Sequence, residues 1–288
     1  MCRAWGATIP SVSDTTRDPV TIRTIRRLVR DGEPFACLTC YDATTARWLE
    51  RAGVHVLLVG DTAAEVVLGF RRTIDMPLDV LIALTAGVKR GAPATMVMAD
   101  MPFMSYQASA DDGVRNAGRF MVEGLADVVK VEADESFAPL VQRMARAGVP
   151  VCAHVGSRPQ TSALTGGYAA AGRIPAEADR IVRDAIALEQ AGAVMLLIEA
   201  VPEDVTRRVL EATTLPLIGI GAGNACHGQV LVLQDLLGMT DAPPPFAEPL
   251  AKLGPAIQQA GEAWVAKVRS AREKPGAGSI RTGRPTKA

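Results

Sequence analysis

Charged residues stand at the ends of several apolar runs in this chain, and their types suit acid, base and metal chemistry. Each run reads as a buried β-strand, as residues 195–198 before Glu199 illustrate. In an α/β barrel the catalytic groups project from the C-terminal ends of the strands. The pattern therefore predicts an enzyme with an acidic centre, formed by Asp61, Asp100, Lys130, Glu132 and Glu199.

The carboxylates in this set suit a hard divalent cation. Mg²⁺ prefers oxygen ligands and needs only one or two protein carboxylates, with further oxygens from water and substrate. Asp61 and Asp100 fit the ligand role best, and Glu132 is expected to ligate the ion or to hold a metal-bound water. The alternative for each carboxylate alone is a helix cap or an ion pair with arginine. Several together at strand ends weaken that alternative, because an unpaired buried charge is costly.

Lys130 lies two residues before Glu132, so both side chains point to the same face of a strand. A lysine beside a metal site can hold a substrate carboxylate as a point charge. The alternative is a plain ion pair with Glu132. His154 ends the predicted fifth strand, where it either hydrogen-bonds a substrate oxygen or is a satisfied core histidine.

A glycine-rich segment, residues 219–224, follows the predicted seventh strand. It is a poor dinucleotide fingerprint, because Asn224 replaces the third glycine and no acidic residue stands at the right distance. In a barrel this position often binds an anion. A tight turn that lets the next helix pack is an equal alternative.

Strand-like and helix-like segments alternate along the chain, which predicts a parallel sheet with crossover helices. The aliphatic runs lack the period-2 alternation of a half-exposed sheet, so both faces are expected to be covered. The fold class predicted is α/β, a (β/α)8 TIM barrel whose bottom is closed by a helix at 20–30. The other helices are predicted at 43–52, 77–90, 108–123, 137–147, 175–191 and 202–213. The strands are predicted at 35–39, 54–59, 95–99, 127–131, 149–154, 194–198, 215–220 and 235–238.

One barrel domain is predicted over residues 19–269, with a flexible N-terminal segment at 1–18 and a flexible C-terminal tail at 270–288. The 31 basic and 31 acidic residues cancel, so neither nucleic acid nor a membrane is an expected partner. No run of about 18 apolar residues suggests a membrane span. Five cysteines form no disulfide framework and no signal peptide precedes the first helix, which predicts a cytoplasmic protein acting on small molecules.

Several ordered motifs carry a family resemblance over roughly residues 21–240. The most specific are Thr39-Cys40-Tyr41-Asp42, Val59-Gly60-Asp61, Arg90-Gly91-Ala92-Pro93, Ala99-Asp100-Met101-Pro102-Phe103-Met104-Ser105-Tyr106, Val129-Lys130-Val131-Glu132, Gly166-Gly167-Tyr168 and Gly219-Ile220-Gly221-Ala222-Gly223-Asn224. In these motifs the chain resembles the ketopantoate hydroxymethyltransferase family. The resemblance implies a (β/α)8 barrel, assembly as a homo-oligomer, typically a decamer, and a role in pantothenate synthesis.

The resemblance also implies a reaction, the transfer of a one-carbon unit from 5,10-methylenetetrahydrofolate to 3-methyl-2-oxobutanoate in the presence of Mg²⁺. In that mechanism the metal polarises the 2-oxo group, which acidifies C3. A carboxylate then removes the C3 proton, and Glu199 matches this proton acceptor. The resulting enolate attacks the methylene donor and gives 2-dehydropantoate.

The remaining roles follow by position from the same resemblance. Asp61 and Asp100 resemble the magnesium ligands, and Glu132 resembles the third acidic residue of the metal site. Lys130 and Thr62 match positions that hold the 2-oxo acid. The expected substrate-binding set is Asp61, Thr62, Asp100, Lys130 and His154.

This chain departs from the family pattern mainly in the loop after the second strand. Where the family has Gly-Asp-Ser-Leu-Gly, residues 60–64 read Gly-Asp-Thr-Ala-Ala, and the usual Gly-His-x-x-Thr appears at 69–73 as Gly-Phe-Arg-Arg-Thr. Ala169 replaces the lysine usual after Gly-Gly-Tyr, and residues 156–158 read Gly-Ser-Arg in place of Gly-Leu-Thr. Because the metal and base positions are intact, enolate chemistry is expected to survive, and a difference is expected in the acceptor side chain or the folate contact.

Two alternatives remain open at this point. One is a Mg²⁺-dependent carbon–carbon lyase acting on a 2-oxo or 2-hydroxy acid, as in the isocitrate lyase and phosphoenolpyruvate mutase superfamily. Its lyases usually carry a catalytic cysteine in a Lys-x-Cys-Gly-type loop, which this sequence lacks. The other is a non-catalytic paralogue that retains the barrel and the oligomer. Against it stands the complete set of Asp61, Asp100, Lys130, Glu132, His154 and Glu199.

Overall fold

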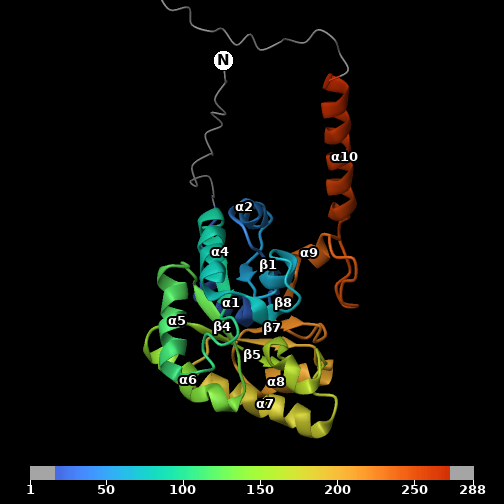
Figure 1. Cartoon of the computed structure of the whole chain (residues 1–288). Helices are drawn as coiled ribbons and strands as arrows, with labels where there is room; N and C mark the ends of the chain where they lie inside the picture. The colour runs from blue at the N-terminus through green and yellow to red at the C-terminus, as the bar shows by residue number, and fades with distance from the viewer. Residues whose placement is uncertain (1–16, 273–288) are drawn as a thin grey trace, which may run out of the picture. The chain divides into compact units, whose positions relative to one another are not determined.

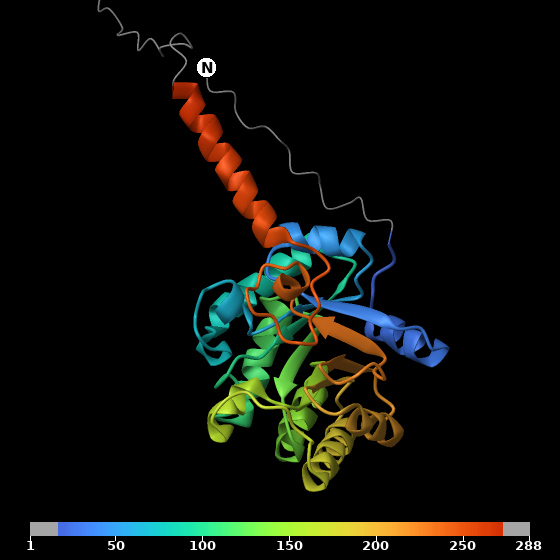
Figure 2. The same cartoon turned by 90° about the vertical axis from the view of Figure 1, so that its right-hand side faces the viewer.

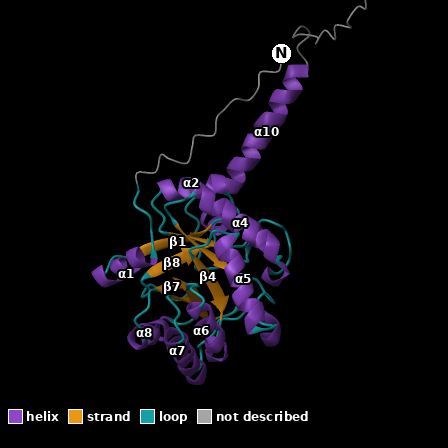
Figure 3. Cartoon of the chain, turned by 90° about the vertical axis from the view of Figure 1, so that its left-hand side faces the viewer, coloured by secondary structure: helices purple, strands orange, loops and turns teal. Residues whose placement is uncertain are grey.

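Eight parallel strands close into a barrel, in which each strand pairs with the next in sequence and β8 pairs with β1. The computed structural model describes residues 17–272. Helices surround the central strands (Figure 1, Figure 3). This arrangement confirms the predicted (β/α)8 barrel. The strands are β1 (Phe35–Thr39), β2 (Val56–Val59), β3 (Met96–Asp100), β4 (Val128–Glu132), β5 (Val151–Gly156), β6 (Met195–Glu199), β7 (Leu217–Ile220) and β8 (Gly228–Leu231).

The helices predicted between the strands all form, and short elements that were not predicted join them. The α-helices of the barrel unit are α1 (Ile22–Asp31), α2 (Ala43–Arg51), α3 (Ala63–Val66), α4 (Leu78–Gly91), α5 (Ala110–Val122), α6 (Ala138–Arg146), α7 (Pro175–Gln190) and α8 (Glu203–Ala212). Three 3₁₀ turns lie in the loops, namely η1 (Thr73–Asp75), η2 (Glu135–Phe137) and η3 (Pro159–Thr165). Both α3 and η3 follow strands directly, so they shape the carboxyl-terminal face.

Apolar side chains pack on both faces of the strands, as the unbroken aliphatic runs predict. Leu57 and Val97 belong to the cluster between strands and helices, whereas their neighbours Val56 and Met96 belong to the cluster inside the barrel. Successive side chains of a strand point to opposite faces. Every second residue of a strand therefore faces the barrel interior.

Helix α1 closes the bottom of the barrel, as predicted. Its buried side chains, Ile25 and Leu28, belong to the interior cluster. The Thr21 hydroxyl caps the helix by accepting a hydrogen bond from Thr24 N–H. In Figure 2, α1 is the blue helix beside the amino end of β1. The interior is thus sealed with apolar groups at the end where the strands begin.

The last strand was predicted at the wrong place. The segment predicted at 235–238 includes the end of α9 (Leu233–Leu236), and the eighth strand is Gly228–Leu231. Glycine and glutamine weaken the strand signal of Gly-Gln-Val-Leu. Gly228 is needed because a Cβ there would collide with the ring of Phe35 on β1. Glycine is therefore required at this position by barrel closure, although its own strand propensity is low.

Residues divide into two compact units, Met1–Leu233 and Gln234–Ala288. In the second unit α10 (Leu253–Arg272) is a helix with exposed apolar side chains. It was not predicted, and it makes the first three residues of the predicted tail, 270–272, helical. The single domain over 19–269 stays a prediction, and most of the predicted flexible ends lie outside the described residues. Between residues 17 and 272 no helix is long and apolar enough to cross a membrane.

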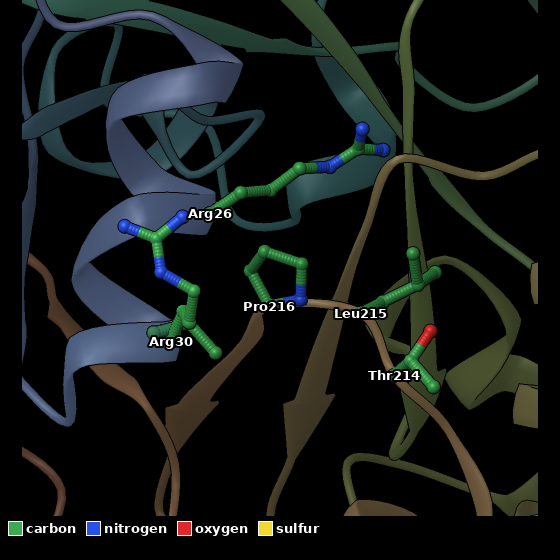
Figure 4. Close-up of a pocket in the computed structure, with 6 residues that line it drawn as sticks. Arg26, Arg30, Thr214, Leu215 and Pro216 are labelled. Atoms are coloured by element: carbon green, nitrogen blue, oxygen red, sulfur yellow. The ribbon is translucent and has the colours of Figure 1, made fainter.

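A surface hollow lies at the amino-terminal end of the barrel (Figure 4). It lies between α1 and the segment that leads into β7. This is the end of the barrel opposite to the charged carboxyl ends of the strands. The six residues around it include no acidic side chain. This hollow is therefore not the place where the predicted chemistry gathers. Its lining consists of Arg26, Val29, Arg30, Thr214, Leu215 and Pro216.

Candidate active site

Four strands place their last inward-facing side chains in one layer above the apolar interior. The strand register sets Asp100 beside Lys130 and Glu132 beside His154. Glu199 ends β6 next to β5. Each of the five follows an interior-cluster residue of its own strand by two or four positions. Since every second residue of a strand points to the same face, all five side chains point into the barrel near the ends of the strands. The interior residues are Met98, Val128, Cys152 and Leu197.

Asp61 and Asp100 meet at the end of β2 and β3. The backbone N–H of Asp61 donates a hydrogen bond of 3.0 Å to Asp100 Oδ2, and Lys130 Nζ lies 3.0 Å from Asp100 Oδ1. A Cβ at Gly60 would make an ordinary contact of 3.5 Å with Asp100 Oδ2 but would crowd the Thr62 hydroxyl at 3.0 Å. Burial raises the pKa of Asp100 to about 6, against the lowering effect of Lys130.

Lys130 is the positive charge at the centre of the layer. Burial alone would lower its pKa, but the attraction of Asp100, Asp61 and Glu132 outweighs burial and raises it. The pKa of Glu132 is raised well above its usual range by burial, again opposed by Lys130. One buried ammonium therefore faces several carboxyl groups at once, and burial disfavours the charged forms of Asp100 and Glu132.

His154 links Lys130 to the predicted base. Its Nδ1 lies 3.4 Å from Lys130 Nζ, and its Nε2 lies 3.3 Å from Glu199 Oε2. Burial, followed by the charge of Lys130, holds the pKa of His154 well below its usual range, so the ring is neutral. Nε2 nevertheless makes no hydrogen bond, so the substrate contact expected for this histidine stays a prediction.

Glu199 is covered by a tyrosine from the loop after η3. Tyr168 Oη donates a hydrogen bond of 2.7 Å to Glu199 Oε1. Burial raises the pKa of Glu199 to about 7, whereas the Tyr168 hydrogen bond and Lys130 lower it. A carboxylate with a pKa near neutrality is suited to accept a proton.

Thr62 lies at the start of α3, next to the acidic layer. Its hydroxyl shares a 2.6 Å hydrogen bond with the hydroxyl of Tyr41, a buried side chain just beyond β1. The contact fixes the Thr62 side chain at the mouth of the barrel. Thr62 thus lies at the same end of the barrel as the acidic layer. The structure therefore brings every predicted site residue to this end.

The fit of a cation was tested on the carboxylates themselves. Within residues 17–272, no three His, Cys, Asp or Glu side chains stand in a ready-made ligating arrangement. Asp100 Oδ1 is buried and forms an ion pair with Lys130 but makes no properly oriented hydrogen bond, so this oxygen keeps the capacity to ligate a cation. Mg²⁺ needs only one or two protein carboxylates. Asp61 and Asp100 therefore fit its chemistry, and the metal assignment stays a prediction.

The glycine-rich segment behaves as a tight turn. Gly223 has a φ of 78°, and a Cβ at this position would collide with the side chain of Glu203. Glu203 Oε2 also accepts a 3.4 Å hydrogen bond from Asn224 N–H. Because the Glu203 carboxylate already occupies this amide, the segment is better described as a tight turn than as an anion-binding site.

Four site residues escaped the sequence analysis as functional groups: Tyr41, Tyr106, Gln160 and Tyr168. They lie in loops that follow strands, so no alternation of apolar and charged residues points to them. Gln160 is buried at 5% exposure and contacts Asp61 and the Glu132 carboxylate. A usable signal was its position a few residues past His154, on the same loop of the catalytic face.

Solved structures with this architecture include two enzymes of low sequence identity. A phosphonopyruvate hydrolase described as a complex with oxalate and Mg⁺⁺ is 13% identical, with 92% of each chain covered and a TM-score of 0.59. A 2,3-dimethylmalate lyase of the PEP mutase/isocitrate lyase superfamily is 19% identical, with 91% of each chain covered and a TM-score of 0.57. These likenesses show the fold alone. Fold and site together define a (β/α)8 barrel enzyme with an acidic centre at the carboxyl ends of its strands.

The profile of the ketopantoate hydroxymethyltransferase family matches residues 19–273. The 3-methyl-2-oxobutanoate hydroxymethyltransferase of Halorhodospira halophila is 45% identical over 251 residues, with 87% of this chain and 91% of the relative covered. That of Alkalilimnicola ehrlichii is 46% identical, with 88% and 92% covered. The chain belongs to the ketopantoate hydroxymethyltransferase family. Membership makes it a hydroxymethyltransferase enzyme, which removes the non-catalytic alternative.

Proposed function

We propose that this enzyme transfers a hydroxymethyl group from 5,10-methylenetetrahydrofolate to 3-methyl-2-oxobutanoate and forms 2-dehydropantoate for pantothenate synthesis. The acceptor comes from the names of relatives 45% and 46% identical. The observation that carries the chemistry is Glu199, a carboxylate with a pKa near 7 held by Tyr168 at the rim of the acidic layer. Glu199 is the group best suited to take the proton from C3 of the 2-oxo acid.

Substrate binding falls to the residues around Lys130. Its buried ammonium offers a point charge for the substrate carboxylate, and the Thr62 hydroxyl stands beside the same layer. The Glu199 carboxylate is oriented by the hydrogen bond from Tyr168, and His154 Nε2 lies 3.3 Å from its other oxygen without making a hydrogen bond. The base is thereby oriented before substrate enters.

Asp61, Asp100 and Glu132 are the residues proposed to hold Mg²⁺, with Glu132 in direct contact or through water. The bound ion supplies a Lewis acid that polarises the 2-oxo group. With C3 acidified, Glu199 removes the proton and the carbanion attacks the methylene carbon of the folate. The new C–C bond replaces the C3–H bond, and one water completes the hydroxymethyl group as tetrahydrofolate leaves.

The altered loop over residues 62–73 is proposed to tune the acceptor or the folate contact. Val67 and Phe70 are exposed there at 45% each, beside the mouth of the barrel formed by the strand ends. Arg72 is engaged by Asp75 through two hydrogen bonds. An apolar rim of this kind favours an apolar acceptor side chain, in keeping with 3-methyl-2-oxobutanoate.

A cytoplasmic homo-oligomer is part of the proposal. Cys37, Cys40, Cys152 and Cys226 are buried free thiols, which suits a reducing compartment. The apolar side chains of α10, including Trp264 at 62% exposure, offer a surface for subunit association. A decamer is the assembly expected from the family.

The test is an assay of the purified protein with Mg²⁺, 5,10-methylenetetrahydrofolate and a panel of 2-oxo acids. The expected product is 2-dehydropantoate, formed fastest from 3-methyl-2-oxobutanoate and lost on chelation of the metal. Formation of a cleaved product from 2-hydroxy or 2-oxo acids without folate would instead support the lyase alternative. Hydroxymethylation of a different 2-oxo acid would locate the change in the 62–73 loop.

A further inference from the structure

Gln160, on η3, makes hydrogen bonds with both polar atoms of its side chain. Its side-chain amide nitrogen donates to Asp61 Oδ2 and to the Met101 carbonyl, each at 3.0 Å. Its amide oxygen accepts from Tyr106 Oη at 3.0 Å and from Gln107 Nε2 at 2.9 Å. With 5% exposure, this side chain is held inside the protein at the edge of the acidic layer.

The orientation of the Gln160 amide is fixed by its partners. The Met101 carbonyl and the Asp61 carboxylate can only accept, so the amide nitrogen must face them. Gln107 Nε2 can only donate, so the amide oxygen must face it. A flipped amide would lose all three hydrogen bonds and set like groups against each other.

The backbone of Gln160 contacts a second carboxylate. Its N–H donates a 3.0 Å hydrogen bond to Glu132 Oε2. Tyr106 reinforces the same point, because its hydroxyl accepts a 3.0 Å hydrogen bond from Glu132 N–H. One residue from the loop after β5 thus engages acidic side chains from the loop after β2 and from β4.

We propose that Gln160 is a positioning residue that orients the Asp61 and Glu132 carboxylates for a divalent cation. The inference rests on the proposed function, since it assigns these carboxylates to Mg²⁺. Hydrogen bonds to ligating carboxylates set their direction and basicity, and loss of such a partner typically lowers metal affinity about 10- to 100-fold. Gln160 does not contact the reacting atoms and acts through Asp61 and Glu132.

The decisive variant is Gln160→Met, which keeps the length of the side chain and removes its hydrogen-bonding groups. By isothermal titration calorimetry, Mg²⁺ affinity should fall about 10- to 100-fold. Saturating Mg²⁺ should restore a large part of the turnover, whereas a merely structural defect would not respond to the cation. Thr161→Ala is the matched control, because its hydroxyl donates to the Arg158 carbonyl on the same turn and does not contact Gln160. Its Mg²⁺ affinity should equal that of the unmodified protein.

Folding is checked by the thermal midpoint and circular dichroism, and Gln160→Asn provides a second variant if the methionine does not fold. The shorter amide cannot reach both Asp61 and Met101, so a loss of affinity is again expected. Unchanged affinity in a folded Gln160 variant would overturn the inference and leave the proposed function intact. No Mg²⁺ binding by the unmodified protein would overturn both.

Discussion

Two groups lie against the Glu199 carboxylate, one near each of its oxygens. Tyr168 donates to Oε1 at 2.7 Å, and His154 Nε2 lies 3.3 Å from Oε2. His154 Nε2 makes no hydrogen bond, so the orientation of the carboxylate rests on Tyr168. The carboxylate is therefore oriented and partly desolvated before any substrate binds, which are the two properties that a general base needs.

Glu199→Gln should abolish exchange of the C3 proton of 3-methyl-2-oxobutanoate with deuterated solvent. The amide keeps the shape of the side chain but cannot accept the proton, so substrate affinity should change little. Exchange is followed by NMR with Mg²⁺ and without folate, which isolates the proton-transfer step. Comparable exchange by the glutamine variant would mean that another group is the base.

The pH dependence of that exchange should follow the ionisation of Glu199. A base acts when unprotonated, so the rate should rise as pH increases through about 7, the pKa of this carboxyl, and level off above it. Tyr168→Phe removes a hydrogen bond that lowers the pKa, so the rising limb should move to higher pH. Since Tyr168 is 56% exposed, solvent screens part of this effect. An unchanged pH dependence of exchange in Tyr168→Phe would mean that Tyr168 does not influence the ionisation of the base.

Thr62→Ser should keep or increase turnover with 3-methyl-2-oxobutanoate. Serine retains the hydroxyl that meets Tyr41 and removes only a methyl group, worth on the order of 1 kcal/mol if it crowds the pocket. Steady-state kinetics on both proteins provides the measurement. A large loss would indicate that the threonine methyl shapes a pocket for another acceptor.

At the residue scale, the sequence reveals what the strand period dictates. Asp100, Lys130, Glu132 and Glu199 end apolar runs, and each lies in the predicted inward layer. Gln160 was missed because its contact with Asp61 joins residues 99 positions apart through a loop. No local pattern encodes such a contact.

At the scale of elements, closure between β8 and β1 depends on a single missing side chain. Gly228↔Phe35 is the first register pair of these strands, and the Phe35 ring occupies the space that a Cβ would need. The same glycine that permits closure weakens the strand signal in the sequence. The other seven strands, rich in aliphatic residues, were predicted close to their observed positions.

Gly228→Ala should destabilise the protein by about 1–3 kcal/mol, the usual cost of an overpacked core position. The thermal midpoint should therefore fall by several degrees in differential scanning calorimetry. Gly118→Ala is the matched control, because its Cβ meets nothing within 4 Å on α5 and alanine favours a helix. That variant should be as stable as the unmodified protein or slightly more stable. Equal midpoints for the two variants would contradict the closure argument.

At the scale of the whole molecule, the notable feature of α10 is a set of exposed apolar side chains. Ile257, Trp264, Val265 and Val268 are all exposed along this helix, by 47% to 62%. Exposed apolar side chains gathered on one element commonly mark an interface. This helix could not be predicted from the alternation of strands and helices, because its apolar side chains do not pack in the barrel core.

Trp264→Glu should reduce the molar mass of the protein in solution, because it places a charge among these apolar side chains. Size-exclusion chromatography with light scattering measures the mass, and circular dichroism checks that the fold persists. Gln259→Glu adds the same charge to the same helix without removing an apolar group, so its mass should stay that of the unmodified protein. An unchanged mass for Trp264→Glu would exclude this residue from the association.

The apolar plug that α1 sets into the barrel through Ile25 and Leu28 has a kinetic consequence. With that end filled by apolar side chains, the reactants of the proposed reaction are expected to reach the acidic layer from the carboxyl ends of the strands. The small acid must reach Lys130 in that layer, so a bulky donor bound first would block its way. For the reaction proposed above, this predicts a compulsory order, in which the acid enters before the folate and 2-dehydropantoate departs last; product-inhibition kinetics measures the order.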